Sequence, residues 1–272
     1  WFSWKRFVHK NISISIKELG LLSKRKMRHD RFQYFIQNKL ALSKHSYNLQ
    51  SYDAVIIGSD QVWNTTLTHG FDPMYWGVWN HQHTIVASYA ASMEDAIASD
   101  KKSEIARFLK NFDYISVREK SIKEQLDPLT DKPIDVVVDP TLLLNREKWL
   151  DLGNKPIIEQ DYLLLYQVRN NHIALDIASK IAAKLKLKLI CLSARIDLGN
   201  DKTTVSSGPL EYLSLFRHAK FVVCTSFHGT VFSILYHVPF FSVILNDGKD
   251  ARVINLLSQA GLSDRGVSEY AN

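Results

Sequence analysis

The sequence predicts an α/β fold built from two doubly wound, Rossmann-like domains. Short, nearly unbroken apolar runs recur from residue 53 onward, and amphipathic segments alternate with them. Strands buried on both faces have this pattern, and regular strand–helix alternation produces repeated βαβ units with a parallel sheet. The length of 272 residues, with 46% hydrophobic and 23% charged residues, suits a globular chain of two domains.

The predicted strands are the β-branched apolar runs, in chain order 53–57, 84–90, 114–118, 134–138, 162–168, 187–193, 220–224 and 240–245. The predicted helices lie between them, at 101–111, 119–126, 171–186, 209–217, 227–237 and 250–260. In 171–186, Ile173, Ile177, Ile181 and Leu185 recur every four residues, so this stripe is expected to face the sheet.

Gly, Asn and Pro interrupt both periodicities at 152–161, which predicts a boundary between domains 1–152 and 157–272. Two such halves facing a cleft would bind ligands at the carboxyl ends of their strands. The chain opens on Trp1 without an initiator Met, and we expect further sequence ahead of it.

The net charge of +6 is concentrated in residues 1–45, which hold eleven Lys and Arg against two acids. Three interpretations are open: the solvated face of a connecting helix, contact with an anionic membrane surface, or nucleic-acid binding. No aromatic platform or nucleic-acid module supports the third. Cys191 and Cys224 each lie in a predicted buried strand, which favours core packing in a reducing compartment.

Motifs for several enzyme classes are missing from the sequence. It has no HExxH or paired CxxC spacing, no GxGxxG or GxxxxGK[ST] loop, and no GxSxG elbow. Metalloenzyme, P-loop and α/β-hydrolase functions are therefore not favoured.

Polar residues follow the first predicted strand directly, in Gly58-Ser59-Asp60-Gln61-Val62-Trp63-Asn64. Gly58 permits a sharp turn, and Ser59 or Asp60 can cap the next segment or face a ligand. A turn explains Gly-Ser-Asp but explains Gln61 and Trp63 less well, so we expect this loop to bind substrate.

Two further candidates end later strands of the first half. Asp139 precedes Pro140 and either caps the next segment or contacts substrate. Arg118 ends the strand at 114–118 and either grips a phosphate or carboxylate in a bidentate fork or pairs with Glu119 at the surface.

The segment 225–230, Thr-Ser-Phe-His-Gly-Thr, stands between a buried strand and a helix. The free N–H groups of a helix start attract anions. Ser226 and Thr230 can add hydroxyl donors, Gly229 admits a close ligand, and His228 can donate a proton, although a single histidine can also be structural. Downstream, Lys249 and Arg252 either close over a phosphate or solvate a loop.

Five motifs, taken in order, resemble the polysaccharide pyruvyl transferase family: YDAVIIGSDQVWN (52–64), SYAAS (88–92), YISVREKS (114–121), VVVDPTLLL (136–144) and VVCTSFHGTVFSILYHVPF (222–240). The tail at 251–265 is also similar. The resemblance implies a GT-B-like pair of domains, with the acceptor on the side of 1–152 and the donor on the side of 157–272. Family members begin with a strand and a glycine-containing loop, and nothing of that kind precedes Trp1.

The resemblance also implies phosphoenolpyruvate as donor, a glycan hydroxyl pair as acceptor, a cyclic ketal as product and no cofactor. By matching motifs, His228 corresponds to the family's SFHG histidine and Arg118 to its strand-end arginine, whereas Lys249 aligns more loosely. We expect His228 to act as acid and base, and Arg118, with Lys249 or Arg252, to bind the donor anions. The expected setting is the cytoplasm, with the basic segment at the inner membrane face, where lipid-linked glycans are built.

Two rival functions share this architecture. A GT-B glycosyltransferase would bind a nucleotide sugar, and a non-catalytic relative would bind glycan or membrane without releasing phosphate. Stabilisation by phosphoenolpyruvate rather than by nucleotide sugars separates the first rival from a pyruvyl transferase.

Overall fold

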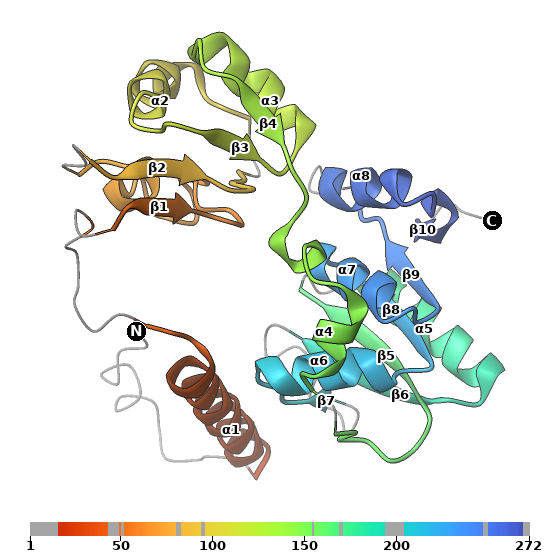
Figure 1. Cartoon of the computed structure of the whole chain (residues 1–272). Helices are drawn as coiled ribbons and strands as arrows, with labels where there is room; N and C mark the ends of the chain where they lie inside the picture. The colour runs from red at the N-terminus through yellow and green to blue at the C-terminus, as the bar shows by residue number, and fades with distance from the viewer. Residues whose placement is uncertain are drawn as a thin grey trace. The chain divides into compact units, whose positions relative to one another are not determined.

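A computed structural model describes residues 16–42, 49, 52–79, 83–93, 96–153, 155–168, 171–193, 204–246 and 250–268. Its contacts form two compact units. The small unit consists of the described residues among 43–149 and 247–252, and the large unit of those among 1–42, 150–246 and 253–272. Each unit is an α/β structure with parallel strands (Figure 1), which confirms the predicted fold class.

The small unit has two parallel strand pairs that join edge to edge. β1 (Ala54–Ile57) pairs with β2 (Ile85–Ser88), and β3 (Ile115–Val117) pairs with β4 (Ile134–Val136). Parallel bridges between Ala87 and Tyr114 and between Ala91 and Val117 link β2 to β3. The carboxyl ends of all four strands therefore meet at one edge, where their polar loops gather.

Aromatic packing forms the core of the small unit. Trp63 and Trp76 stack with ring centroids 4.9 Å apart, and the edge of Phe112 meets Trp63 at 5.6 Å. Helices α2 (Lys102–Leu109) and α3 (Lys120–Leu126) add Phe108 and Leu126 to this cluster. Burial of such large rings contributes much of a domain's stability.

The large unit contains a six-stranded parallel sheet in the order β10-β9-β8-β5-β6-β7. Its strands are β5 (Tyr162–Gln167), β6 (Lys188–Ser193), β7 (Thr204–Val205), β8 (Phe221–Cys224), β9 (Phe240–Val243) and β10 (Gly266–Val267). The chain runs from β5 to one edge and then returns through β8 to the other, so the order reverses between β5 and β8. This is the strand order of the Rossmann fold, whose ligands bind at the reversal.

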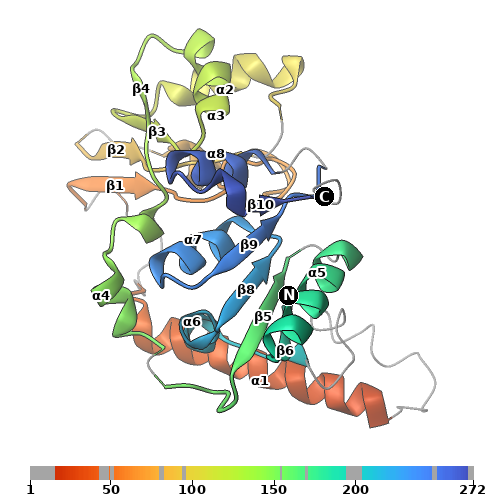
Figure 2. The same cartoon turned by 90° about the vertical axis from the view of Figure 1, so that its right-hand side faces the viewer.

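Helices cover both faces of this sheet. They are α5 (His172–Leu185), α6 (Pro209–His218), α7 (Phe227–Leu235) and α8 (Ala251–Gln259), and a short α4 (Arg146–Leu150) precedes β5. Figure 2 shows α5 on one side of the strands and α6 and α7 on the other. Right-handed crossovers in opposite directions from β5 and β8 require this arrangement.

All eight predicted strands and six predicted helices are present, with ends within two residues of the predicted ones. The sequence missed β7 and β10, which are two residues each and too short to leave a periodic pattern. The stripe expected on α5 is also displaced: Ala174, Ala178 and Ala182 are the buried residues, and Leu185 is 49% exposed. Alanines bring the helix axis close to the sheet, so the isoleucines pack at the border of the contact rather than at its centre.

The N-terminal helix α1 (Ile16–Lys39) packs on the large unit. The Arg31 guanidinium donates to the Ser206 carbonyl at 2.7 Å and lies 3.3 Å from Glu211 of α6. The Ser206 hydroxyl in turn donates to the Lys24 carbonyl at 2.9 Å. The predicted boundary assigns this helix to 1–152; polar contacts distant in the sequence, which no local pattern records, attach it to the later half.

Candidate active site

The loops at the carboxyl edge of the small unit converge on one buried arginine. Arg118, at the end of β3, donates from Nη1 to Asp139 Oδ2 at 2.6 Å, from Nη2 to Asp60 Oδ1 at 3.1 Å, and from Nε to Glu119 Oε1 at 3.1 Å. Its side chain is 3% exposed. The residue therefore ties the ends of β1, β3 and β4 together.

This geometry shows which groups already contact the Arg118 guanidinium. The sequence predicted a guanidinium fork open to a donor anion or a surface pair with Glu119, but all three guanidinium nitrogens contact carboxylates of the same unit. Burial by itself lowers the pKa of Arg118, yet Glu119, Asp139 and Asp60 together raise it above its usual value. The guanidinium therefore stays charged, and each of its nitrogens is engaged with a carboxylate.

Glu119 is predicted from the sequence only as a surface partner of Arg118, but it is a buried member of this cluster. It is 7% exposed, and its Oε1 also accepts from the Ser92 hydroxyl at 2.8 Å. Its Oε2 is buried without a hydrogen-bond partner. Burial raises the pKa of Glu119, and Arg118, Ser92 and Arg252 oppose that rise. The adjacent motifs SYAAS and YISVREKS were the available signal, because they place Ser92 and Glu119 at the ends of neighbouring strands.

The loop after β1 requires the glycine that begins it. Gly58 has φ of +126°, and a Cβ there would stand 2.2 Å from the Tyr89 carbonyl oxygen. The loop then exposes Asp60, whose side chain is 59% accessible, and half-buries Ser59. Asp60 thus presents a carboxylate to solvent while Arg118 holds it from within.

Gln61 and Arg252 extend this polar edge. Arg252 Nη1 lies 4.0 Å from Asp60 Oδ1. The Gln61 amide is 2.7 Å from Asn64 Nδ2, and with its oxygen turned to the guanidinium that oxygen is 2.9 Å from Arg252 Nη2. Amide orientations are assigned from such networks. Lys249, the other cation predicted here, lies outside the described residues.

Two predicted binding residues of the small unit, Trp63 and Asp139, are buried and hold its own structure together. Trp63 is 1% exposed, and its Nε1 donates to the Tyr75 carbonyl at 2.8 Å, so it belongs to the core. Asp139, 2% exposed, accepts at Oδ1 from the Thr141 backbone N–H at 3.0 Å. Of the two roles left open for Asp139, the structure shows the cap, combined with the ion pair to Arg118.

In the large unit, the turn from β8 into α7 stands at the reversal of strand order. Ser226 caps α7 and accepts the Gly229 N–H at 3.0 Å. The strand before it pairs with β5, and the Thr225 N–H donates to the Tyr166 carbonyl at 3.1 Å. His228 follows in the first helical turn, half-buried, with its ring edge-to-face with Phe227 at 5.3 Å. The imidazole is therefore held at the edge where ligands of this fold bind.

Gly229 and Thr230 face inward from the same turn. A Cβ on Gly229 would come within 2.8 Å of Cys224 Cβ, so the glycine is needed for packing of the helix on its strand. Thr230 is fully buried; its hydroxyl donates to the Ser226 carbonyl at 3.1 Å and lies 2.7 Å from Ser242 Oγ. Burial also raises the pKa of Cys224, as expected of an inert core thiol.

The chain is an α/β protein whose large unit has the Rossmann strand order with a histidine at the order reversal, and whose small unit carries a buried charge network at its strand ends. The family model for polysaccharide pyruvyl transferases matches residues 2–248. The chain belongs to this family and is an enzyme of that type, acting with a pyruvate donor and a glycan acceptor.

Among the solved structures that this chain resembles is an epimerase of low sequence identity. The UDP-GlcNAc 2-epimerase of Methanocaldococcus jannaschii aligns with a TM-score of 0.45 and 17% identity, over 90% of this chain and 70% of that protein. A search of curated proteins finds no match. Within the described ranges, no helix is long and apolar enough to cross a bilayer, and no group of three or more His, Cys, Asp or Glu residues is placed to hold a metal ion.

Proposed function

We propose that the protein transfers pyruvate from phosphoenolpyruvate to a pair of glycan hydroxyls and forms a cyclic ketal. The family supports the reaction class, and the observation that carries the donor assignment is the position of His228. An imidazole in the first turn of a helix that opens from a central strand can face an anion bound at the positive end of that helix.

The chemistry requires an acid, an anion site and a base. Protonation of the methylene carbon of phosphoenolpyruvate gives a methyl group and an oxocarbenium-like centre at the adjacent carbon. One sugar hydroxyl attacks that carbon and loses its proton; the second hydroxyl then displaces phosphate. The two hydroxyl protons are balanced by the new methyl C–H bond and by the proton on the released phosphate.

His228 is the proposed acid, and it takes a hydroxyl proton in return as the base. The N–H groups at the start of α7 and the Ser226 hydroxyl are proposed to bind the donor anion, with Lys249 and Arg252 as further cations. Arg118 acts indirectly in this scheme, by fixing Asp60 and the end of β1. Asp60, Gln61 and Ser59 are the proposed contacts to the acceptor hydroxyls, supported by the exposure of Asp60 at the strand ends.

Phosphate release from phosphoenolpyruvate in the presence of glycan acceptors tests the reaction. His228→Ala should lower turnover by about 10²–10⁴, the contribution of an oriented acid, while its melting temperature stays that of the wild type. His83→Ala is the matched control, because His83 is exposed just before β2, at the amino ends of the small unit's strands and away from their polar loops. Near-normal turnover of His228→Ala would refute the assignment of the acid.

A ligand titration tests the donor without requiring the correct acceptor. Phosphoenolpyruvate at 100 times its Kd should stabilise the native protein by about 2.7 kcal/mol, and UDP-sugars should have no effect. Stabilisation by the nucleotide sugars alone would favour glycosyl transfer instead.

We further propose that the acceptor is lipid-linked and that the basic segment 1–45 contacts the inner face of a membrane. Arg28 and Arg31 of α1 contact other parts of the large unit, whereas Arg25 is exposed, as is Lys26, which pairs with Asp30 on the same helix. The exposed pair should attract anionic lipid in a salt-dependent manner. Equal sedimentation with neutral and with anionic liposomes would exclude this contact.

A further inference from the structure

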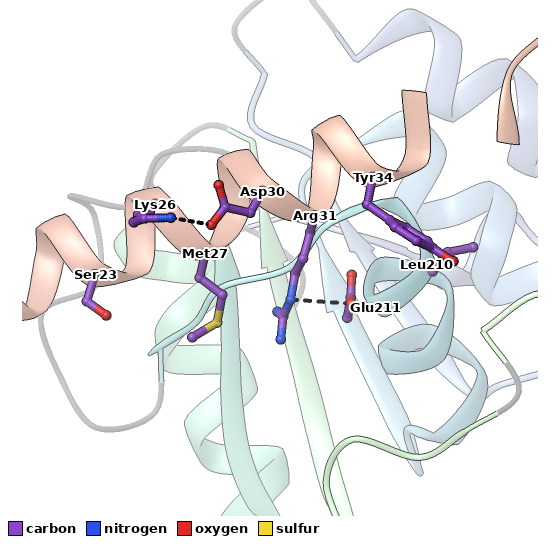
Figure 3. A pocket seen from close by; sticks show the side chains of 8 residues that line it. All are labelled: Ser23, Lys26, Met27, Asp30, Arg31, Tyr34, Leu210 and Glu211. Carbon is purple, nitrogen blue, oxygen red and sulfur yellow. Dashed lines mark hydrogen bonds and ion pairs between the residues drawn. The ribbon is translucent and has the colours of Figure 1, made fainter. Parts of the chain in front are cut away.

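A groove of about 500 Å³ lies between helix α1 and the start of α6, within the large unit (Figure 3). Polar and apolar side chains from both helices line it, among them Lys26, Asp30, Arg31, Tyr34, Leu210 and Glu211. None of these residues belongs to a predicted site, because about 170 residues separate the two helices in the sequence and they meet only in the fold.

The groove is at the ligand-binding edge of the six-stranded sheet. Arg28 of α1 donates to the carbonyl of Ser193, the last residue of β6, at 3.4 Å. Arg31 donates to the carbonyl of Ser206, which directly follows β7. Helix α6 begins three residues later, so α1 crosses the carboxyl ends of β6 and β7. In open α/β sheets the ligands bind outside these strand ends.

The charges in the groove are paired within it. Lys26 Nζ is 2.7 Å from Asp30 Oδ2, and Arg31 Nε is 3.3 Å from Glu211 Oε1. Glu211 also accepts the Gly208 N–H at 3.0 Å. Two cations balanced by two carboxylates give a lining rich in donors and acceptors but without excess charge. Such a lining does not select a multiply charged anion, and it suits a neutral ligand with many hydroxyls.

Apolar surface accompanies these polar groups. Tyr34 is 55% exposed and Met27 is 44% exposed, and Figure 3 shows the Tyr34 ring beside Leu210. A ring that is apolar on its face and carries a hydroxyl at its tip matches a sugar, whose C–H face is apolar and whose rim is hydroxylated. The combination identifies the ligand class as carbohydrate.

We propose that this groove binds sugars of the glycan acceptor that lie beyond the sugar that receives pyruvate. The assignment of the bound glycan as acceptor rests on the proposed function; the carbohydrate class rests on the groove itself. A subsite remote from the reacting hydroxyls supplies binding energy to longer acceptors and none to the shortest.

Tyr34→Ala tests the groove, with Tyr114→Ala as the matched control. Tyr114 is 68% exposed and directly precedes β3, at the strand edge opposite the polar loops. With oligosaccharides of the cello-, chito-, galacto- and manno-series as probes, Tyr34→Ala should raise the KM for long acceptors about tenfold, a factor worth about 1.4 kcal/mol. The KM for the shortest acceptor, the kcat and the melting temperature should not change, and Tyr114→Ala should match the wild type throughout.

Binding of the same probes, measured calorimetrically in the absence of phosphoenolpyruvate, separates this inference from the proposed function. Glycan binding that Tyr34→Ala weakens, in a protein that releases no phosphate, would support the groove and overturn the proposed transfer. Phosphate release with an unchanged length dependence in Tyr34→Ala would support the transfer and overturn the groove. A wild-type protein that binds none of the probes would also overturn the groove.

Discussion

The buried network around Arg118 makes the sharpest prediction for stability. Arg118→Met keeps most of the side-chain volume but removes the guanidinium that pairs with the buried carboxylates of Glu119 and Asp139, which are 7% and 2% exposed. Removing one partner of a buried ion pair costs about 3–5 kcal/mol. Because domains are typically stable by about 5–15 kcal/mol, this single change should remove about a fifth or more of the free energy of unfolding.

Urea denaturation followed by tryptophan fluorescence measures this loss of unfolding free energy in the small unit. Four of the six tryptophans, namely Trp63, Trp76, Trp79 and Trp149, lie in the small unit, and Trp1 and Trp4 are outside the described residues. The urea midpoint of Arg118→Met should fall by about 1 M or more for typical slopes. Arg107→Met is the control, because it breaks an exposed pair with Glu104 in the same unit and should cost under about 1 kcal/mol.

The loss of unfolding free energy in Arg118→Met should be larger at neutral pH than at acidic pH. Burial already raises the folded-state pKa of Glu119, and removal of Arg118, which opposes that rise, would raise it further. Such groups favour the fold below the unfolded pKa and destabilise it as the pH rises through the folded pKa. Arg118→Met should therefore be closer to the wild type at about pH 5 than at about pH 7. Equal urea midpoints for Arg118→Met and the wild type at both pH values would refute the network as the element that holds the strand ends.

Three further changes test individual positions. Gly58→Ala should destabilise the small unit, since the new methyl meets the Tyr89 carbonyl in a backbone conformation with φ of +126°; an unchanged melting curve would contradict this. Glu119→Gln should flatten the pH dependence of the free energy of unfolding above pH 4.5. Burial raises the pKa of the wild-type carboxyl from 4.5, so its contribution to stability is present below pH 4.5 and lost as the pH rises. A pH dependence like that of the wild type would contradict this. Thr230→Val should cost about 1–3 kcal/mol by leaving buried polar partners unsatisfied, measured by thermal unfolding, and no loss would contradict the buried hydroxyl network.

The sequence by itself determined the α/β class, the eight longer strands, six helices and the family. These follow from local patterns, because a strand buried on both faces must be apolar along its length and a helix on a sheet must be apolar along a stripe. The motifs also located the polar strand ends, where Asp60, Arg118 and His228 lie. Their chemistry is readable from residue type and from position after a strand.

The tertiary structure decided which of these residues face solvent and which pair with each other. Trp63 belongs to the predicted ligand loop in the sequence, yet it stacks in the core. Arg118 is predicted from the sequence as an anion-binding residue, and the fold brings Asp60 and Asp139 to it from the ends of other strands. Helix α1 and its groove with α6 depend on contacts across about 180 residues. Burial and pairing are properties of three-dimensional neighbours, and sequence periodicity reports only the face that a residue presents, not the partner that meets it.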